Sequence, residues 1–202
     1  MPQGEESLAV RRFFAILKTD DDEAIEGAVY LLAPSDEAAL LARLDGADEE
    51  TRWWLLRALA YCGSAAALPA VATATRAQAA ASRAVATMTL GHLLQQRPEL
   101  AAPYWVQLTA GLGDEDGMVR QVATDTLAQC GNAAIEALVQ VLRFSENQGA
   151  RSRAAAALSK IRTLEAAGPL YRCLNDPNYL VHTYAYEALD DMGLLENTLI
   201  QF

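Results

Sequence analysis

Aromatic rings, arginines and one glutamine supply the groups of this sequence that are best suited to bind another molecule. Rings bury a large apolar area and guanidinium groups pair with carboxylates, so together they favour a protein partner or a flat ligand. The candidate binding residues are Trp53, Trp54, Arg57, Tyr61, Arg120, Gln140, Arg143, Arg172, Tyr184 and Tyr186. No general acid or base can be assigned among them, so the catalytic residues stay unknown and enzymatic activity stays open.

The adjacent tryptophans Trp53 and Trp54 stand out among these candidates. Neighbouring residues of a helix point about 100° apart, so both rings cannot face the core at once. One ring is predicted to be buried between repeats and the other to lie at a seam or on the surface. A structural explanation has equal weight, because large rings can fill the gaps left by alanines and arginines can pair with acidic groups of the next repeat.

No metal site or reactive thiol is recognisable in the sequence. His92 and His182 lie ninety residues apart, without the paired spacing of metal ligands. Cys62, Cys130 and Cys173 are an odd number without a C-x-x-C pair, which fits packed thiols in a reducing cytosol. The acidic clusters fall where helices are expected to begin, so capping and the helix dipole explain them. We therefore expect no metal and no required cofactor.

Composition and charge indicate a cytoplasmic protein whose partner is another protein. The 202 residues are 52% apolar and 21% charged, and no stretch reaches the ~20 apolar residues that span a bilayer. The acidic segment 1–6 lacks the order of a secretory signal. A net charge of −10 repels phosphate backbones and anionic lipids, which argues against nucleic acid and against membrane insertion.

A repeat runs through the chain and accounts for many of these residues by position. A basic anchor is followed by a leucine seven residues later and by a turn position eleven residues later. Successive anchors are 31, 37, 31 and 31 residues apart (52 to 83, 83 to 120, 120 to 151 and 151 to 182), and a degenerate copy is expected over 20–44 with Leu31 as its leucine. The five clear copies are Arg52-Leu59-Gly63, Arg83-Leu90-Leu94, Arg120-Leu127-Gly131, Arg151-Leu158-Arg162 and His182-Leu189-Gly193.

Each copy is predicted to form two antiparallel helices, the anchor helix first and a shorter helix after it. The anchor helix begins after an acidic or amide turn that caps free backbone N–H groups, as at Asn147. It ends near Gly63, Gly131 or Gly193, where a left-handed residue can close the last turn. The shorter helix is clearest over 133–142.

Helix pairs of this kind must stack, because one pair cannot bury its own apolar face. The predicted fold is all-α, an alpha-alpha superhelix (HEAT-like solenoid) of about six stacked antiparallel helix pairs. We expect a single domain over 1–202, with a capping helix over 1–19, repeats over 20–196 and a terminal cap over 197–202.

The shorter helices are expected to line the concave face of the solenoid. Glu136, Gln140 and Arg143 have the spacing of one polar ridge on such a helix, and Arg172 occupies the equivalent place one repeat later. A repeat surface of this kind suits extended protein binding.

The repeat core V-R-x-x-A-x-x-x-L-x-x-x-G, which stands at 119–131, resembles the short HEAT-like repeats of the phycobilisome lyase family. The copy at 176–189 looks most like the terminal repeat of such cyanobacterial proteins. The resemblance covers about residues 20–196, and it departs from the pattern where His182 replaces the arginine and Leu94 replaces the terminal glycine. The motif is specific for fold and carries little information on function.

Members of that family attach open-chain tetrapyrroles to cysteines of antenna proteins, remove or isomerise them, or act as chaperones in antenna assembly. The resemblance therefore implies that the concave face holds a phycobiliprotein subunit, a bilin (phycocyanobilin or phycoerythrobilin), or both. A second HEAT-repeat lyase subunit is a further partner that it implies. A bilin requires cations for its propionates and aromatic walls for its rings, and a carboxylate can bind its pyrrole N–H groups.

Three functions stay open on this basis. The favoured one is a protein-binding scaffold or chaperone related to the bilin lyases, which needs no catalytic group of its own. The second is a true bilin lyase, or one subunit of it. The third is a generic HEAT adaptor that is unrelated to pigments.

Overall fold

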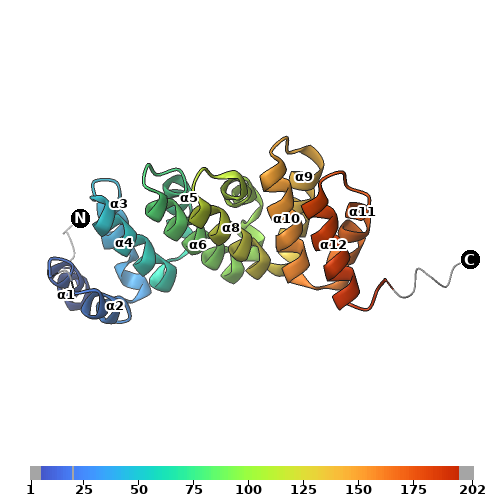
Figure 1. The fold of residues 1–202 in the computed structure, drawn as a ribbon. Helices are drawn as coiled ribbons and strands as arrows, with labels where there is room; N and C mark the ends of the chain where they lie inside the picture. The colour runs from blue at the N-terminus through green and yellow to red at the C-terminus, as the bar shows by residue number, and fades with distance from the viewer. Residues whose placement is uncertain (1–5, 20, 196–202) are drawn as a thin grey trace, which may run out of the picture. The chain divides into compact units, whose positions relative to one another are not determined.

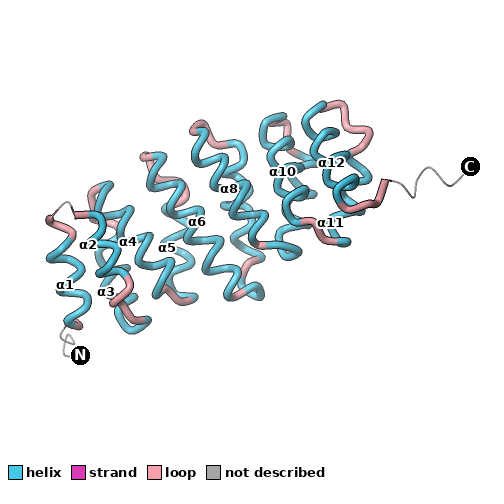
Figure 2. Tube along the Cα trace, turned by 60° about the horizontal axis from the view of Figure 1, so that its bottom comes forward, coloured by secondary structure: helices cyan, strands magenta, loops and turns pink. Residues whose placement is uncertain are grey.

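The computed structural model describes residues 6–19 and 21–195, so the predicted cap over 197–202 lies outside the described residues. Within them the chain consists of α-helices joined by short turns and 3₁₀ segments, without β-strands (Figures 1 and 2). The predicted all-α class of stacked helix pairs is confirmed. The helices of the described residues are α1 (Leu8–Ile16), α2 (Asp22–Val29), α3 (Glu37–Leu44), α4 (Glu49–Cys62), α5 (Leu68–Ala74), α6 (Ala80–Gln96), α7 (Trp105–Ala110), α8 (Gly117–Gln129), α9 (Ile135–Phe144), α10 (Gln148–Ile161), α11 (Leu164–Cys173) and α12 (Tyr179–Asp191).

These helices form two compact units. Unit 1 (Met1–Arg97) contains α1 to α6, and unit 2 (Pro98–Phe202) contains α7 to α12. The single domain expected over 1–202 stays a prediction. None of the helices in the described ranges has the length and apolar character that a membrane span requires.

Within each unit the long anchor helices lie side by side, and the short helices pack against them. In unit 1, α4 lies beside α6, and in unit 2, α10 lies between α8 and α12 (Figures 1 and 2). Each short helix packs mainly on the long helix that follows it, as α3 does on α4, α5 on α6 and α9 on α10. The predicted order within a pair, with the anchor helix first, is therefore wrong. Turn signals flank each anchor helix on both sides, so only packing decides which neighbour is its partner.

The predicted N-terminal caps of the anchor helices are confirmed in four of the five clear copies. The side chain of Asp48 accepts a hydrogen bond from the backbone N–H of Thr51 at the start of α4. The equivalent caps of α8, α10 and α12 are Asp116, Asn147 and Asn178. The exception is α6, which begins after Ala79 and has no side-chain cap.

The expected left-handed residues at the ends of the anchor helices are present in two of the three named positions. Gly131 and Gly193 have φ of +59° and +67°, but Gly63 has φ of −71° and ψ of 150°, so the prediction is wrong there. Glycine is required at that position for another reason, because a Cβ would collide with the carbonyl of Leu59. Arg162 takes the left-handed conformation in its copy, with φ of 51°, although it is not a glycine.

Three anchor arginines, Arg52, Arg83 and Arg120, fold back onto the turn that precedes their own helix. Their guanidinium groups donate to carbonyls that are left open there, which explains a basic residue at this place in these three copies. The acceptors are Ala47 O for Arg52 (2.7 Å), Gln78 O for Arg83 (2.7 Å), and both Asp114 O and Glu115 O for Arg120 (2.8 Å each).

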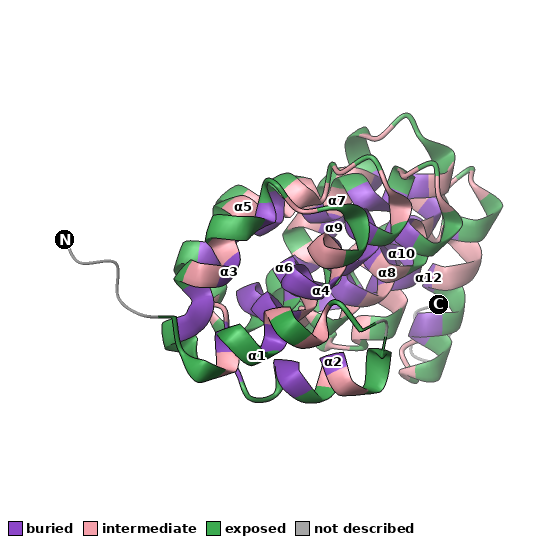
Figure 3. Cartoon of the chain, turned by 90° about the vertical axis from the view of Figure 1, so that its left-hand side faces the viewer, coloured by how far each residue is buried: buried purple, intermediate pink, exposed green. Residues whose placement is uncertain are grey.

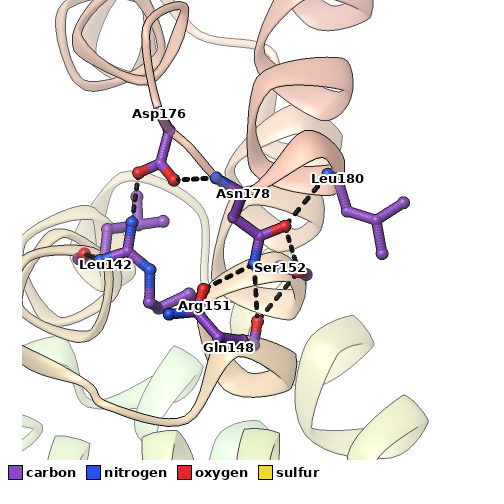
Figure 4. Close-up of polar contacts among 7 residues, drawn as sticks. All are labelled: Leu142, Gln148, Arg151, Ser152, Asp176, Asn178 and Leu180. Atoms are coloured by element: carbon purple, nitrogen blue, oxygen red, sulfur yellow. Dashed lines mark hydrogen bonds and ion pairs between the residues drawn. The ribbon is translucent and has the colours of Figure 1, made fainter.

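Arg151 bonds to the last turn of α9 and to the turn before α12, and so ties neighbouring repeats of unit 2 together (Figure 4). Its Nη1 donates to Leu142 O at 2.5 Å, and its Nη2 forms an ion pair with Asp176 from the turn before α12. Asp176 also accepts the backbone N–H of Asn178, whose side-chain amide donates to Gln148 at the start of α10. The start of α12 is thereby fixed to the start of α10.

The leucines of the ladder form the core, as the register predicted. Leu59, Leu90, Leu127, Leu158 and Leu189 all have 0% exposure. In the cartoon coloured by burial, buried segments lie along the anchor helices (Figure 3).

The leucine proposed for the degenerate copy is the exception. Leu31 is 52% exposed, because α2 ends at Val29 and the chain turns before that residue. Ile25, Val29 and Leu32 are buried in its place. The degenerate copy therefore contributes its core through other positions than the ladder predicts.

Candidate functional site

Unit 1 contains a hollow of about 480 Å³ at the first turns of three helices. We call it the tryptophan hollow. Its walls come from the beginning of α2, from the first two turns of α4 and from the uncapped beginning of α6. It is lined by Asp22, Glu49, Glu50, Trp53, Trp54, Ala79, Ala81 and Ser82.

The two tryptophans provide the aromatic wall. Trp54 is 6% exposed and belongs to the core, whereas Trp53 is only half-buried, as predicted for adjacent rings on one helix. Their ring centroids are 4.8 Å apart at an interplanar angle of 84°. This edge-to-face contact holds the half-buried Trp53 ring in place, and the ring remains part of the wall of the hollow.

Three carboxylates share the hollow with the rings, and no basic side chain of the described residues lines it. Asp22, Glu49 and Glu50 are exposed residues in the first turns of α2 and α4. The sequence assigned these acids to capping alone. The spacing contained a further signal, because Glu49 and Glu50 precede Trp53 by four and three residues and so share its helix face. Asp22 gave no such signal, because it comes from another helix.

Arg57 and Tyr61 lie further along α4, outside the hollow, and both contact residues of α2 or of its C-terminal end. Arg57 forms an ion pair with Glu26 at 2.5 Å, and Tyr61 contacts Tyr30 edge to face with centroids 5.4 Å apart. The Tyr30 hydroxyl donates to Glu26 at 2.7 Å, and this bond to a carboxylate raises the pKa of Tyr30. The charge of Arg57 is thus matched within the chain.

In unit 2, Arg143 and Arg172 come together while Gln140 stays with its own helix. The two arginines line a hollow of about 250 Å³ between α9 and α11, beside Pro169 and the buried Cys173. Gln140 donates to Glu136 at 2.6 Å one turn away. Arg143 thus reaches α11 while Gln140 bonds within α9, and the polar ridge as a binding surface stays a prediction.

The other candidates of unit 2 lie among the long helices. Tyr184 lines a third hollow between α8, α10 and α12. Tyr186 stacks on His182, with centroids 6.3 Å apart and planes at 23°. Arg120 is bonded to the turn before α8. The candidates of unit 2 therefore fall into separate places rather than one site, and their roles in binding stay predictions.

The titratable groups of the described residues give no sign of a metal centre. No group of three histidines, cysteines or carboxylates that could hold a metal ion occurs among them. Cys62 and Cys173 are buried thiols, and burial raises the pKa of Cys62 to about 11, helped by the nearby carboxylates of Asp36 and Glu37. Glu37 itself is buried and accepts the backbone N–H and the hydroxyl of Ser64. These acids act as a structural link between turns.

The raised pKa of Cys62 predicts slow alkylation. At pH 8 a thiol with a pKa of about 11 is about 0.1% thiolate, against about 10% for its ordinary value of 9.0. We therefore expect iodoacetamide to modify Cys62 about a hundredfold more slowly in the folded chain than in urea, measured by peptide mass spectrometry. The unfolded thiol ionises first as the pH rises from 9 to 11, so this group also lowers stability across that interval. Equal rates in the two states would contradict the burial of this thiol.

Comparison with known proteins agrees with the helical-repeat architecture. Residues 106–190, from α7 to α12, match the family model for HEAT repeats. A crystal structure of an engineered protein is similar at 20% identity and a TM-score of 0.49, over 91% of this chain and 96% of that one. Human deoxyhypusine hydroxylase in complex with glycerol is similar at 20% identity and a TM-score of 0.36, over 92% of this chain and 84% of that one. No curated protein matches the sequence.

Residues 106–190 are therefore similar to HEAT repeats, and the stacked helix pairs of the described residues have the form of a HEAT-like solenoid. HEAT repeats generally mediate protein interactions, so a helical scaffold or adaptor is the class of function that the architecture supports. The match is to HEAT repeats in general, and the link to phycobilisome lyases stays a prediction.

Proposed function

We propose that this chain is a protein-binding scaffold whose tryptophan hollow accepts a basic side chain of its partner. The observation that carries the proposal is the pairing of two tryptophan rings with three carboxylates in one hollow of about 480 Å³. A lysine ammonium or an arginine guanidinium binds over a tryptophan face and pairs with carboxylates at the same time.

Charge supports this choice of ligand. Among the described residues, no arginine or lysine lines the tryptophan hollow. Its charged side chains are therefore all carboxylates. The whole chain carries −10, which attracts a basic partner and repels an acidic one. The acids lie in the first turns of α2 and α4, where the helix dipole favours negative side chains.

Ser82 adds a polar group to the same hollow. It is 1% exposed, and its Oγ has no hydrogen-bond partner among the described residues. A buried polar atom without a partner costs free energy, so a ligand that reaches it gains a bond that the free protein lacks. The N–H groups of a bound ammonium or guanidinium can donate to this hydroxyl oxygen.

A bilin fits this hollow only in part. The tryptophans can wall its rings, and the carboxylates can accept its pyrrole N–H groups. Its propionates require cations, and the lining of the tryptophan hollow contains none. No lyase step is derived for these residues, and the bilin and a phycobiliprotein subunit remain the second candidates. A cytoplasmic location belongs to the same proposal, since an odd number of cysteines without a C-x-x-C pair suits a reducing compartment.

Fluorescence titration of the full chain tests the basic ligand. Trp105→Phe removes the third tryptophan, which is in unit 2, so the emission then reports on Trp53 and Trp54. We expect an acetylated tetrapeptide amide that carries one lysine to change this emission saturably, and its glutamine counterpart to have no effect. Trp53→Ala should weaken binding about tenfold, and Glu49→Gln with Glu50→Gln should weaken it and reduce its salt dependence.

The same protein separates the alternative functions. Saturable binding of phycocyanobilin, or of an apo-antenna subunit, in place of the lysine peptide would support the second candidates. A covalent, zinc-fluorescent adduct that requires this chain would establish a lyase and overturn the scaffold-only proposal. If neither basic peptides nor bilin bind, the tryptophan hollow is not the binding surface and the generic adaptor is favoured.

A further inference from the structure

Unit 2 has a hollow of opposite character to the tryptophan hollow. It measures about 230 Å³, lies between α8, α10 and α12, and is lined almost wholly by polar side chains. We call it the Arg153 hollow. It is lined by Gln121, Thr124, Ser152, Arg153, Ala156, Ser159, Lys160, Leu180 and Tyr184.

Arg153 is the group in this hollow whose charge is not matched. It is half-buried on α10, and its Nη1 donates only to Gly149 O, at 3.2 Å, in its own helix. No carboxylate forms an ion pair with it within the described residues. Desolvation and the neighbouring charge of Arg120 lower the pKa of Arg153 from its ordinary value. A half-buried cation in this position is stabilised by an incoming anion.

The second cation of the hollow, Lys160, is exposed and is already paired with a carboxylate. Lys160 is exposed two turns after Arg153 on α10, and it pairs with Asp125 of α8 at 2.5 Å. Gln121 donates to the same carboxylate at 2.8 Å, and these partners lower the pKa of Asp125. Asp125 thereby matches the charge of Lys160. Arg153 is left as the lining cation without a carboxylate partner among the described residues.

Three of the hydroxyls that line the hollow can offer a ligand only hydrogen-bond acceptors. Thr124, Ser152 and Ser159 each donate their hydrogen to a carbonyl of their own helix, at 2.8, 3.0 and 2.8 Å. Ser152 is also beside Asn178 in the network that fixes the start of α12, and Leu180 follows in that helix (Figure 4). The walls are therefore held by contacts between repeats, and they suit a ligand that carries N–H or O–H donors beside its anionic group.

We infer that the Arg153 hollow binds an oxyanion group, a carboxylate or a phosphate, through the guanidinium of Arg153 and the hydroxyl of Tyr184. A guanidinium forms paired hydrogen bonds with either group, which a lysine ammonium cannot do in the same geometry. The site is independent of the basic ligand proposed for unit 1, since it uses other residues and the opposite charge. Peptide carboxylates bring N–H donors with them, and inorganic phosphate brings O–H donors, so both are possible sources of the group.

Isothermal titration of the full chain tests this inference with two probes, inorganic phosphate and an acetylated tetrapeptide amide that carries one glutamate. We expect saturable binding of at least one probe below about 20 mM. Arg153→Gln should weaken it about 10- to 100-fold, because a charge-assisted bond is lost. Tyr184→Phe removes only the hydroxyl and should weaken it about 3- to 10-fold.

Controls distinguish an anion site from a structural role of Arg153. Arg12→Gln makes the same change of charge on an exposed residue of α1 and should alter binding less than about twofold. Without anion, Arg153→Gln should not lower the thermal midpoint, because a partly desolvated cation beside Arg120 is removed. With a saturating probe the midpoint of the unaltered chain should rise by about 3–6 °C, and that of the variant should not.

The probes also identify the source of the anion. Tighter binding of the glutamate peptide than of phosphate indicates an acidic protein segment, and the reverse order indicates a phosphate group. The inference is overturned if neither probe binds the unaltered chain, or if Arg153→Gln binds them equally well. A glutamine-for-glutamate peptide that binds as tightly as the glutamate peptide overturns it as well.

Discussion

Leu127→Ala should lower the free energy of unfolding by about 2–5 kcal/mol. Leu127 is the ladder leucine of α8 and has 0% exposure. The helix packs against α10 and against the 3₁₀ segment Gly111–Gly113, so the lost methyl groups leave a cavity that these elements cannot fill completely. The thermal midpoint should fall by about 4–20 °C, measured by circular dichroism at 222 nm.

Glu136→Ala is the matched control for this change. Glu136 is exposed on α9 and accepts one hydrogen bond from Gln140 at 2.6 Å. A surface pair one turn apart contributes about 0.2–0.5 kcal/mol, so this variant should be nearly as stable as the unaltered chain. Equal and small effects of the two substitutions would show that the register of the repeat is wrong.

Arg151→Met should be the second large effect, at about 2–4 kcal/mol of lost stability. Methionine keeps the apolar stem but removes the bond to Leu142 O and the ion pair with Asp176 (Figure 4). The side chains of the pair are only 15% and 13% exposed, so Asp176 would lose its counter-charge where water replaces it poorly. Urea unfolding of the variant measures the loss.

A double-mutant cycle isolates the ion pair from the rest of this change. Arg151→Met and Asp176→Asn, singly and together, should give a coupling energy of about 1–3 kcal/mol. The exposed pair of Arg162 and Asp191, at 62% and 53% exposure, has the same chemistry and should give below about 0.5 kcal/mol. Equal coupling in both pairs would show that the Arg151 network does not join the repeats in solution.

The predicted parts of the fold rest on local spacing. A leucine seven residues after each anchor lies on the same face as that anchor, and all five such leucines are buried. Asp48, Asp116, Asn147 and Asn178 cap their helices because the cap depends only on the next two or three backbone N–H groups. The left-handed glycines Gly131 and Gly193 follow the same logic.

The failures occur at the ends of helices. Gly63 has an extended backbone, and it is glycine because the carbonyl of Leu59 leaves no room for a Cβ. Leu31 has the ladder spacing but lies beyond the end of α2 and is exposed. In both cases the way in which the helix ends, which the ladder spacing does not give, decides the outcome.

The candidate binding residues also divide into those that local spacing identified and those whose partners only the structure shows. Trp53 and Trp54 were identified from their type and adjacency, and the exposure of one ring followed from helix geometry. Arg57 was identified by type, but Glu26 of another helix pairs with it. Arg153 was not identified, because an unmatched charge is recognised only when its neighbours are known.

The sequence alone determined the positions of the anchor helices, their caps, the leucine core and the tryptophan pair. Each of these depends on residues within about two turns of one another, where backbone geometry relates spacing directly to direction. Tertiary structure alone decided which helix pairs with which, and it brought Asp22 to the tryptophans and Tyr184 to Arg153. Contacts between helices depend on how their surfaces interlock, and this packing is not contained in the period of any one helix.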